Sequence, residues 1–414
     1  MSPHRRYTPD ISRPGRSGLW RAGLRGSRLI IATLLCALTL APSLYAANGD
    51  DQDDLLSQPP GTETVQAVAS PRFAFALSKF PGRIYGFTIE PTSGRLKANG
   101  SFQACQGSVG LAVDGPGQWL YVACSSKPFQ IAVLKIDAAG HLALQQSMPV
   151  TGAPVGVAVH PNNGSVYVTK SLPGSGPMTT SFTLQRYTRN RQNGRLAFAE
   201  EQRSLGADPF AVALTPKGNY AFVANLNGNS LRTFRINPIS GQMTAVGYTR
   251  TCTSPTSLSV PRQGDLLLVG CVSRDSVSPN SVHMYEIHPI TGALKLVDRR
   301  GVFAAGVGIS PDGNSAIVSY WDDKTVARYT IDHTAKKLVL RQVVADTGGN
   351  PSIYNGSVVF NPDGKSFYVV NVYDRTGYRA GNVQRYTIDH ATGKVMPQEY
   401  MPAGFQPVAL AIAK

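Results

Sequence analysis

Positively charged side chains recur at one kind of position along this chain and could together bind an anionic ligand. Each lies within five residues after the end of a short apolar segment, and the set consists of Lys79, Lys127, Lys170, Arg274 and Arg375. Cations gathered around one opening attract carboxylates and phosphates, and they can stabilise a developing oxyanion. The alternative is that they are solvated loop residues of a basic protein, which has 40 Lys and Arg against 25 Asp and Glu.

Carboxylates occur at comparable positions and could act as a general base. Asp208 precedes an apolar segment, whereas Asp322, Asp323 and Asp374 follow such segments. We take Asp208 and Asp374 as candidate bases and Arg375 as a candidate oxyanion-stabilising residue. Asp208 stands before Pro209 and could instead only shape a turn. The other side chains expected to contact a ligand are Asn225, Trp321, Asp322, Tyr354, Asn371 and Tyr373.

Histidines lie away from these positions. His160 follows an apolar segment in a Pro-containing turn, and the others beyond the first 47 residues fall in or beside a second class of turns and strands: His141, His283, His288, His333 and His390. We therefore expect neither a histidine-activated nucleophile nor a histidine-ligated metal, and no cofactor. The basic residues are not interleaved with aromatic residues, so we also expect no nucleic-acid partner.

Two repeated elements must position these residues. The first is an apolar strand, a Pro/Gly turn and a second apolar strand, at residues 111–124, 157–170, 212–225, 258–271, 307–320 and 358–371. The second is a pair of strands joined by a tight turn. Six copies have a glycine in this turn and one has Lys336, at Gly94, Gly140, Gly194, Gly241, Gly292, Lys336 and Gly393. Four short strands in each unit of about 45 residues are typical of a β-propeller blade.

The two ends of the repeat region complete each other. Residues 407–413 read as an innermost strand with no partner after it, and residues 72–78 read as a second strand with no innermost strand before it. Pairing them closes the ring and removes two open sheet edges. The sequence therefore predicts an all-β, seven-bladed propeller of four antiparallel strands per blade, over residues 68–414.

The region before the propeller resembles an export signal. Residues 1–47 hold seven arginines, an apolar run at 29–40 and small residues at 46–47, which predicts a signal peptide. An uncleaved membrane anchor is the alternative. Residues 48–67 are acidic and polar and predict a disordered linker. We expect a periplasmic or secreted monomer with no membrane span after cleavage.

Four cysteines beyond the leader form two pairs with the same separation. Cys105 and Cys124, like Cys252 and Cys271, are 19 residues apart. In each pair the first precedes an innermost strand and the second ends the next strand, so an antiparallel hairpin brings them together. In an oxidising compartment this predicts two disulfides within blades, with metal binding as the weaker alternative.

The phrases YTIDHATGKV, FRINPISGQM and YEIHPITGAL, with SPDG and NPDG turns before AIVSY and FYVVN, resemble the bacterial propeller lactonases, which include 6-phosphogluconolactonases, and the related YVTN-repeat propellers. The resemblance implies a lactone substrate. It also implies a histidine pair eight and six positions before one turn proline, and a glutamate five positions before a later one. This sequence has Asp208 and Phe210 at the first two positions, and Gly306 or Ser357 at the third.

Two functions remain open on this basis. The first is an exported lactonase-like propeller that binds, and hydrolyses if it is active, an anionic lactone or sugar acid at a basic channel mouth. The second is a non-catalytic scaffold that binds a protein or a glycan in the cell envelope.

Overall fold

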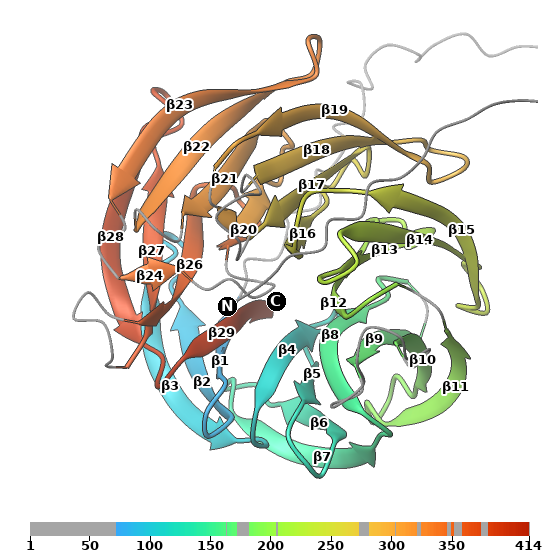
Figure 1. Ribbon diagram of the computed structural model, residues 1–414. Coiled ribbons are helices and arrows are strands. Elements are labelled where there is room, and N and C mark those ends of the chain that lie inside the picture. Colours follow the sequence, from blue (N-terminus) through green and yellow to red (C-terminus); the bar gives the residue numbers. More distant parts are fainter. Residues whose placement is uncertain are drawn as a thin grey trace, which may run out of the picture. The chain divides into compact units, whose positions relative to one another are not determined.

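The computed structural model describes residues 72–162, 164–171, 182–203, 206–272, 281–302, 304–320, 324–345, 349–351, 358–373 and 380–413. The predicted signal peptide and linker lie outside them. These residues form seven antiparallel sheets arranged in a ring (Figure 1). The predicted seven-bladed propeller is therefore confirmed. No helix in this part of the chain is long and apolar enough to cross a membrane.

Each blade has four strands, with the innermost nearest the ring axis. From blade one to blade seven, the innermost strands are β29 (Pro407–Ala413), β4 (Ser108–Val113), β8 (Ala153–Val159), β12 (Pro209–Leu214), β16 (Pro255–Ser259), β20 (Ala304–Ile309) and, in two pieces, β24 (Asn350–Pro351) with β25 (Val358–Phe360). The second strands are β1 (Phe73–Ser78), β5 (Trp119–Cys124), β9 (Ser165–Ser171), β13 (Tyr220–Asn225), β17 (Leu266–Cys271), β21 (Ser315–Tyr320) and β26 (Ser366–Tyr373).

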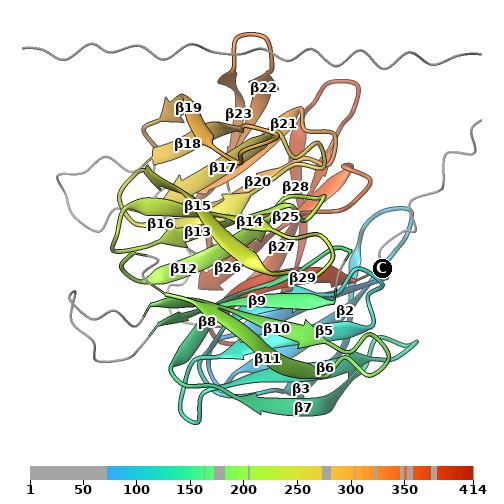
Figure 2. The same cartoon turned by 90° about the vertical axis from the view of Figure 1, so that its right-hand side faces the viewer.

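The outer half of each blade follows in the same order. The third strands are β2 (Arg83–Ile89), β6 (Gln130–Ile136), β10 (Thr183–Arg189), β14 (Ser230–Ile236), β18 (Ser281–Ile287), β22 (Thr325–Asp332) and β27 (Asn382–Ile388). The outermost strands are β3 (Leu96–Gln103), β7 (Leu142–Pro149), β11 (Leu196–Gln202), β15 (Met243–Arg250), β19 (Leu294–Arg300), β23 (Lys337–Ala345) and β28 (Val395–Pro402). Figure 2 shows the ring from the side.

The ring closes through blade one, as the sequence predicts. β29 pairs antiparallel with β1, with Phe73 opposite Ala413 and Leu77 opposite Ala409. The backbone N–H of Arg72 also donates to the carbonyl of Ala413 at 2.9 Å. The last strand thus supplies the innermost strand of the first blade.

The core lies between the blades. Seven apolar clusters are present, and each joins one blade to its neighbour. The second strands are covered on both faces and are buried along their whole described length apart from a terminal residue in β9 and β26. This explains why they read as continuous apolar runs rather than as alternating strands.

Buried tyrosines link neighbouring blades by side-chain hydrogen bonds. The hydroxyl of Tyr121 in blade two donates to the carbonyl of Gly194 in blade three at 3.1 Å, and Tyr368 of blade seven donates to Gly94 of blade one at 2.6 Å. These acceptors lie in the turns between third and outermost strands. The six predicted turn glycines have φ between 68° and 85°, and Lys336 takes the same left-handed conformation at 54°.

Both predicted disulfides are present. Cys105 is bonded to Cys124 in blade two, and Cys252 to Cys271 in blade five. Each closes a 19-residue separation between the segment before an innermost strand and the end of the second strand.

We expect replacement of Cys252 and Cys271 together by alanine to lower the free energy of unfolding by about 3 kcal/mol, because the crosslink restricts the unfolded chain over a loop of about 20 residues. Equilibrium urea unfolding measures the change. Mass spectrometry after alkylation without reductant supplies the independent control. Four alkylated thiols among these cysteines would contradict the pairing.

Candidate functional site

The predicted ligand-binding residues that the structure describes belong to one face of the ring. This face, here called the entry face, holds the loops from second to third strands and the segments that lead from each outermost strand into the next innermost strand. The opposite face, here called the turn face, holds the turns within the two repeated hairpins. Of the candidates, Arg274, Trp321, Asp322, Tyr354, Asp374 and Arg375 lie outside the described residues.

The ends of the second strands are more enclosed than the sequence suggests. The seven corresponding residues are all buried: Ser78, Cys124, Lys170, Asn225, Cys271, Tyr320 and Asn371. Within this set, Asn225 donates to the Ser230 hydroxyl at 3.1 Å, and Asn371 donates to the Asn382 side chain at 3.1 Å. These two amides therefore stabilise the hairpins that end at the entry face.

Lys170 is part of a buried ion pair. Its Nζ lies 2.9 Å from Oε2 of Glu201 on β11, and the two side chains are 7% and 14% exposed. Burial tends to raise the pKa of Glu201, but hydrogen bonds from Lys170 and Gln185 and the charges of Lys170 and Arg203 outweigh it and hold that pKa below its usual range. The prediction of Lys170 as an accessible cation at the mouth is corrected, because its charge is already balanced by a glutamate that is distant in sequence.

Lys79 and Lys127 are accessible cations on the entry face. Lys79 is half-buried, with its ammonium 5.5 Å from the ring centre of Phe80, while Lys127 is exposed in the loop after β5. The side chain of Ser78 bonds to the carbonyls of Phe80 and Phe405, and these two rings are 43% and 44% exposed. Blade one thus presents a cation beside the exposed ring of Phe80.

Asp208 is held in a defined conformation where the chain enters β12. Its φ is 60°, in the left-handed region that aspartate and asparagine tolerate better than most residues. Its carbonyl accepts from the Leu226 N–H at 2.8 Å, and its carboxylate accepts from Nδ2 of Asn227 at 3.1 Å. The side chain is only partly buried. Asp208 therefore combines a fixed backbone with a carboxylate that solvent can reach.

Tyr373 connects blade seven to the segment before β29. Its hydroxyl accepts a hydrogen bond from Nε2 of Gln406 at 2.9 Å, and its side chain is partly buried. Its contact with a ligand stays a prediction, as do those of Lys79, Lys127, Asn225 and Asn371.

One described histidine reaches a segment of the entry face: Nδ1 of His283 lies 3.4 Å from Oγ1 of Thr251, between β15 and β16. His160 lies in a turn of blade three, where Nε2 is 2.9 Å from the Gly218 carbonyl, and burial lowers its pKa. His283 lies on β18, and burial and the charge of Arg299 lower its pKa. Both are placed to serve packing between strands or blades.

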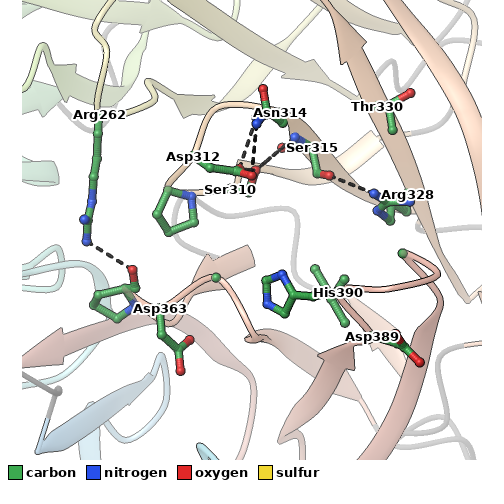
Figure 3. A pocket seen from close by; sticks show the side chains of 15 residues that line it. Arg262, Ser310, Asp312, Asn314, Ser315, Arg328, Thr330, Asp363, Asp389 and His390 are labelled. Atoms are coloured by element: carbon green, nitrogen blue, oxygen red, sulfur yellow. Dashed lines mark hydrogen bonds between the residues drawn. The ribbon is translucent and has the colours of Figure 1, made fainter. Parts of the chain in front are cut away.

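The turn face contains a cavity that the sequence reasoning missed. It has a volume of about 430 Å³ and lies where turns of blades six and seven meet (Figure 3). Among its lining residues, Arg328 and Arg262 carry positive charge, and His390 projects between the two turns. A comparison of third strands within the sequence would have drawn attention to Arg328, since Arg186 and Arg385 occupy the same place in blades three and seven.

Comparison with known proteins confirms the resemblance to propeller lactonases. The family model described as "Lactonase, 7-bladed beta-propeller" matches residues 177–260 and 201–302. No curated protein matches the chain.

Two similar solved structures carry related descriptions. A putative 6-phosphogluconolactonase from Bacteroides fragilis is 18% identical with a TM-score of 0.68, over 86% of this chain and 100% of that one. The periplasmic gluconolactonase of Pseudomonas aeruginosa is 14% identical with a TM-score of 0.67, over 83% of this chain and 99% of that one. At these identities the likeness establishes the fold.

Proposed function

We propose that this chain, a seven-bladed propeller similar to the propeller lactonases, is an exported protein that binds and hydrolyses an anionic lactone at its entry face. The observation that carries the proposal is the position and conformation of Asp208. It stands where the family resemblance implies a histidine, and it offers a partly buried carboxylate on a fixed backbone. The two similar solved structures bear the names of a putative 6-phosphogluconolactonase and a gluconolactonase. This supports the lactone of a sugar acid as the substrate class.

Asp208 is suited to act as a general base. Its carboxylate accepts a hydrogen bond from Asn227, which orients it, and an ionised carboxylate can accept a proton. Asp208 would take a proton from water as the water oxygen bonds to the lactone carbonyl carbon. The carbonyl oxygen then carries the negative charge of the tetrahedral intermediate. When this intermediate collapses, the bond to the ring oxygen breaks, and the ring oxygen receives the proton from Asp208.

The accessible cations favour a negatively charged substrate. Lys79 and Lys127 raise the local concentration of anions at the entry face, and Arg375 is our proposed partner for the oxyanion. The net product is a hydroxy acid, which ionises and releases one proton for each lactone opened.

The two disulfides support an extracytoplasmic location. Disulfides form and persist in oxidising compartments, and here two of them lie in separate blades. Together with the predicted signal peptide, they favour a periplasmic or secreted protein.

We expect Asp208→Asn to lower kcat for lactone hydrolysis about 100-fold or more, because it removes the base and keeps the shape. Asparagine accepts the left-handed backbone and can still receive the hydrogen bond from Asn227. Titration of released acid at constant pH, with glucono-δ-lactone and 6-phosphogluconolactone, measures the rate above spontaneous hydrolysis.

The matched control is Asp265→Asn, an exposed aspartate in a turn of blade five on the opposite face. It should hydrolyse lactone at the parent rate. If Asp208→Asn also keeps that rate, or if the parent protein hydrolyses no lactone above background, the catalytic proposal fails.

A second candidate function is binding of an envelope protein or glycan without catalysis. The exposed ring of Phe80 beside Lys79 favours it, because aromatic side chains and cations are common at binding surfaces. Loss of a co-purifying partner on Phe80→Ser, with no lactone hydrolysis by the parent, would support this function instead.

A further inference from the structure

The cavity on the turn face exists because blade six lacks a large side chain that other blades have. The first and third residues of the second strand fill the space toward the next blade, for example Trp119 and Tyr121 in blade two. The side chain of Tyr121 reaches the turn carbonyl of Gly194. Blade six has Ser315 and Ile317 at these positions. A serine and an isoleucine leave the gap against blade seven open.

Arg328 faces this gap from β22 and has no carboxylate partner among the described residues. At the same strand position, Arg186 bonds to Glu200 at 2.9 Å, and Arg385 bonds to Glu399 at 2.8 Å. The residue across from Arg328 is Gln342. The pattern of a third-strand arginine with an outermost-strand glutamate is therefore broken in blade six.

Gln342 is also hydrogen-bonded to the next blade. Its Oε1 accepts from the Val395 N–H at 2.7 Å, and its Nε2 donates to the Val395 carbonyl at 2.9 Å. The guanidinium of Arg328 donates to the Ser315 hydroxyl at 3.1 Å, while its Nε is buried with no hydrogen-bond partner in the described part of the chain. A partly buried charge with open donors is costly unless an anion joins it.

The charges around Arg328 also leave its guanidinium poorly compensated. Burial lowers the pKa of its guanidinium, and the positive charge of Arg341 lowers it further, with Asp312 opposing them. Arg262, at the other side of the cavity, donates to the carbonyl of Pro362 at 3.3 Å. Figure 3 shows the two arginines on opposite sides with His390 between them.

The carboxylates of the cavity are already bonded within their own turns. Asp312 accepts from the Asn314 N–H at 3.1 Å and from the Ser310 hydroxyl, and Asp363 accepts from the Lys365 N–H at 2.9 Å. Asp389 accepts from the N–H groups of the two residues that follow His390. Their remaining lone pairs can accept hydrogen bonds from hydroxyl groups of a ligand but would repel a bare anion.

We propose that this cavity binds a polyhydroxy anion, a sugar acid or a sugar phosphate, with its charged group on Arg328 and its hydroxyls on the turn carboxylates. An arginine fork matches the geometry of either a carboxylate or a phosphate. The volume of about 430 Å³ is within the usual range for small-molecule sites. This second site lies on the face opposite Asp208 and does not depend on lactone hydrolysis.

The test compares four probes by isothermal titration calorimetry: gluconate, glucose 6-phosphate, sorbitol and inorganic phosphate. We expect gluconate or glucose 6-phosphate to bind, and whichever binds more tightly identifies the anionic group. Sorbitol lacks the charge and inorganic phosphate lacks the hydroxyl chain, so both should bind at least about tenfold more weakly.

Two variants assign binding to Arg328 rather than to another site. Arg328→Gln should weaken binding about 10- to 100-fold by removing a charge-assisted contact. Gln342→Glu keeps the arginine but supplies the carboxylate found in blade three, where Oε1 of Glu200 accepts both from Arg186 and from the Met243 N–H at 2.8 Å. It should weaken binding equally while the protein stays folded, as thermal melting without ligand will show.

Arg235→Gln is the control, because Arg235 is an exposed third-strand arginine of blade four near the same face. It should bind the probe as the parent does. The entry face is the same in the parent and in all these variants, so binding there contributes equally to each. A difference in affinity between parent and variant therefore measures binding in the cavity. The proposal is overturned if the parent binds no probe at about 10 mM, if Gln342→Glu binds as the parent does, or if sorbitol or phosphate binds as tightly as the polyhydroxy anions.

Discussion

Asp114→Ala should lower the free energy of unfolding by about 3–5 kcal/mol, because it removes one partner of an ion pair buried between blades two and three. The Asp114 carboxylate lies 2.9 Å from Nη1 of Arg189, and the two side chains are 1% and 7% exposed. The same carboxylate accepts from the N–H groups of Gln118 and Trp119 at 2.8 and 2.9 Å. The substitution leaves a buried guanidinium uncompensated and also opens the turn before β5.

Equilibrium urea unfolding, with thermal melting as a second measure, tests this expectation. Asp265→Ala is the control, since Asp265 lies exposed in the corresponding hairpin of blade five and its loss should cost less than about 0.5 kcal/mol. Asp114→Asn separates the contributions, because asparagine can keep the turn hydrogen bonds but not the charge. A loss below about 1 kcal/mol for Asp114→Ala would show that solvent reaches the pair.

Ending the chain at Gln406 should prevent stable folding, which is the largest effect we expect. The truncation removes β29, whose Val408, Ala409 and Leu410 are at most 4% exposed. Burying one valine or leucine side chain contributes about 1.5–3 kcal/mol, so the loss is comparable to the total stability of many domains. It also leaves β1 with an open edge that can pair with other chains. Size-exclusion chromatography and circular dichroism measure the outcome.

A permuted chain provides the control for this truncation. Moving residues 407–413 in front of Arg72, through the turn sequence NPDGK taken from residues 361–365, should restore a folded monomer. The design is possible because Ala413 pairs with Phe73, so the added turn recreates the hairpin of the other blades. If the truncated chain instead melts within a few degrees of the parent, ring closure by β29 is not needed for stability.

Much of the fold could be predicted because the repeat exposes it. Each turn position marked by glycine has the left-handed backbone that glycine favours, and the single exception, Lys336, adopts it as well. The cysteine spacing fixed both disulfides, since an antiparallel hairpin brings residues 19 apart in this pattern to neighbouring positions. Ring closure followed from two incomplete ends that complement each other.

The sites were harder to predict because side-chain partners come from strand register and from neighbouring blades. Lys170 follows the pattern of an accessible cation, but the register of β9, β10 and β11 places it beside Glu201. The cavity next to Arg328 depends on Ser315 and Ile317 in β21 and on Gln342 being bonded to Val395 of the next blade. No single segment contains this information, although aligning the repeats with one another reveals part of it.

The pairing of β1 with β29 also sets an order for assembly during synthesis. A ribosome makes β1 first and its partner last, so the circle cannot be completed until all other blades have left the ribosome. Until then β1 keeps a bare edge that a holding chaperone would need to shield. For a polypeptide threaded across a membrane in unfolded form, this delay is useful, because the leading end cannot lock into its final shape before the trailing end arrives.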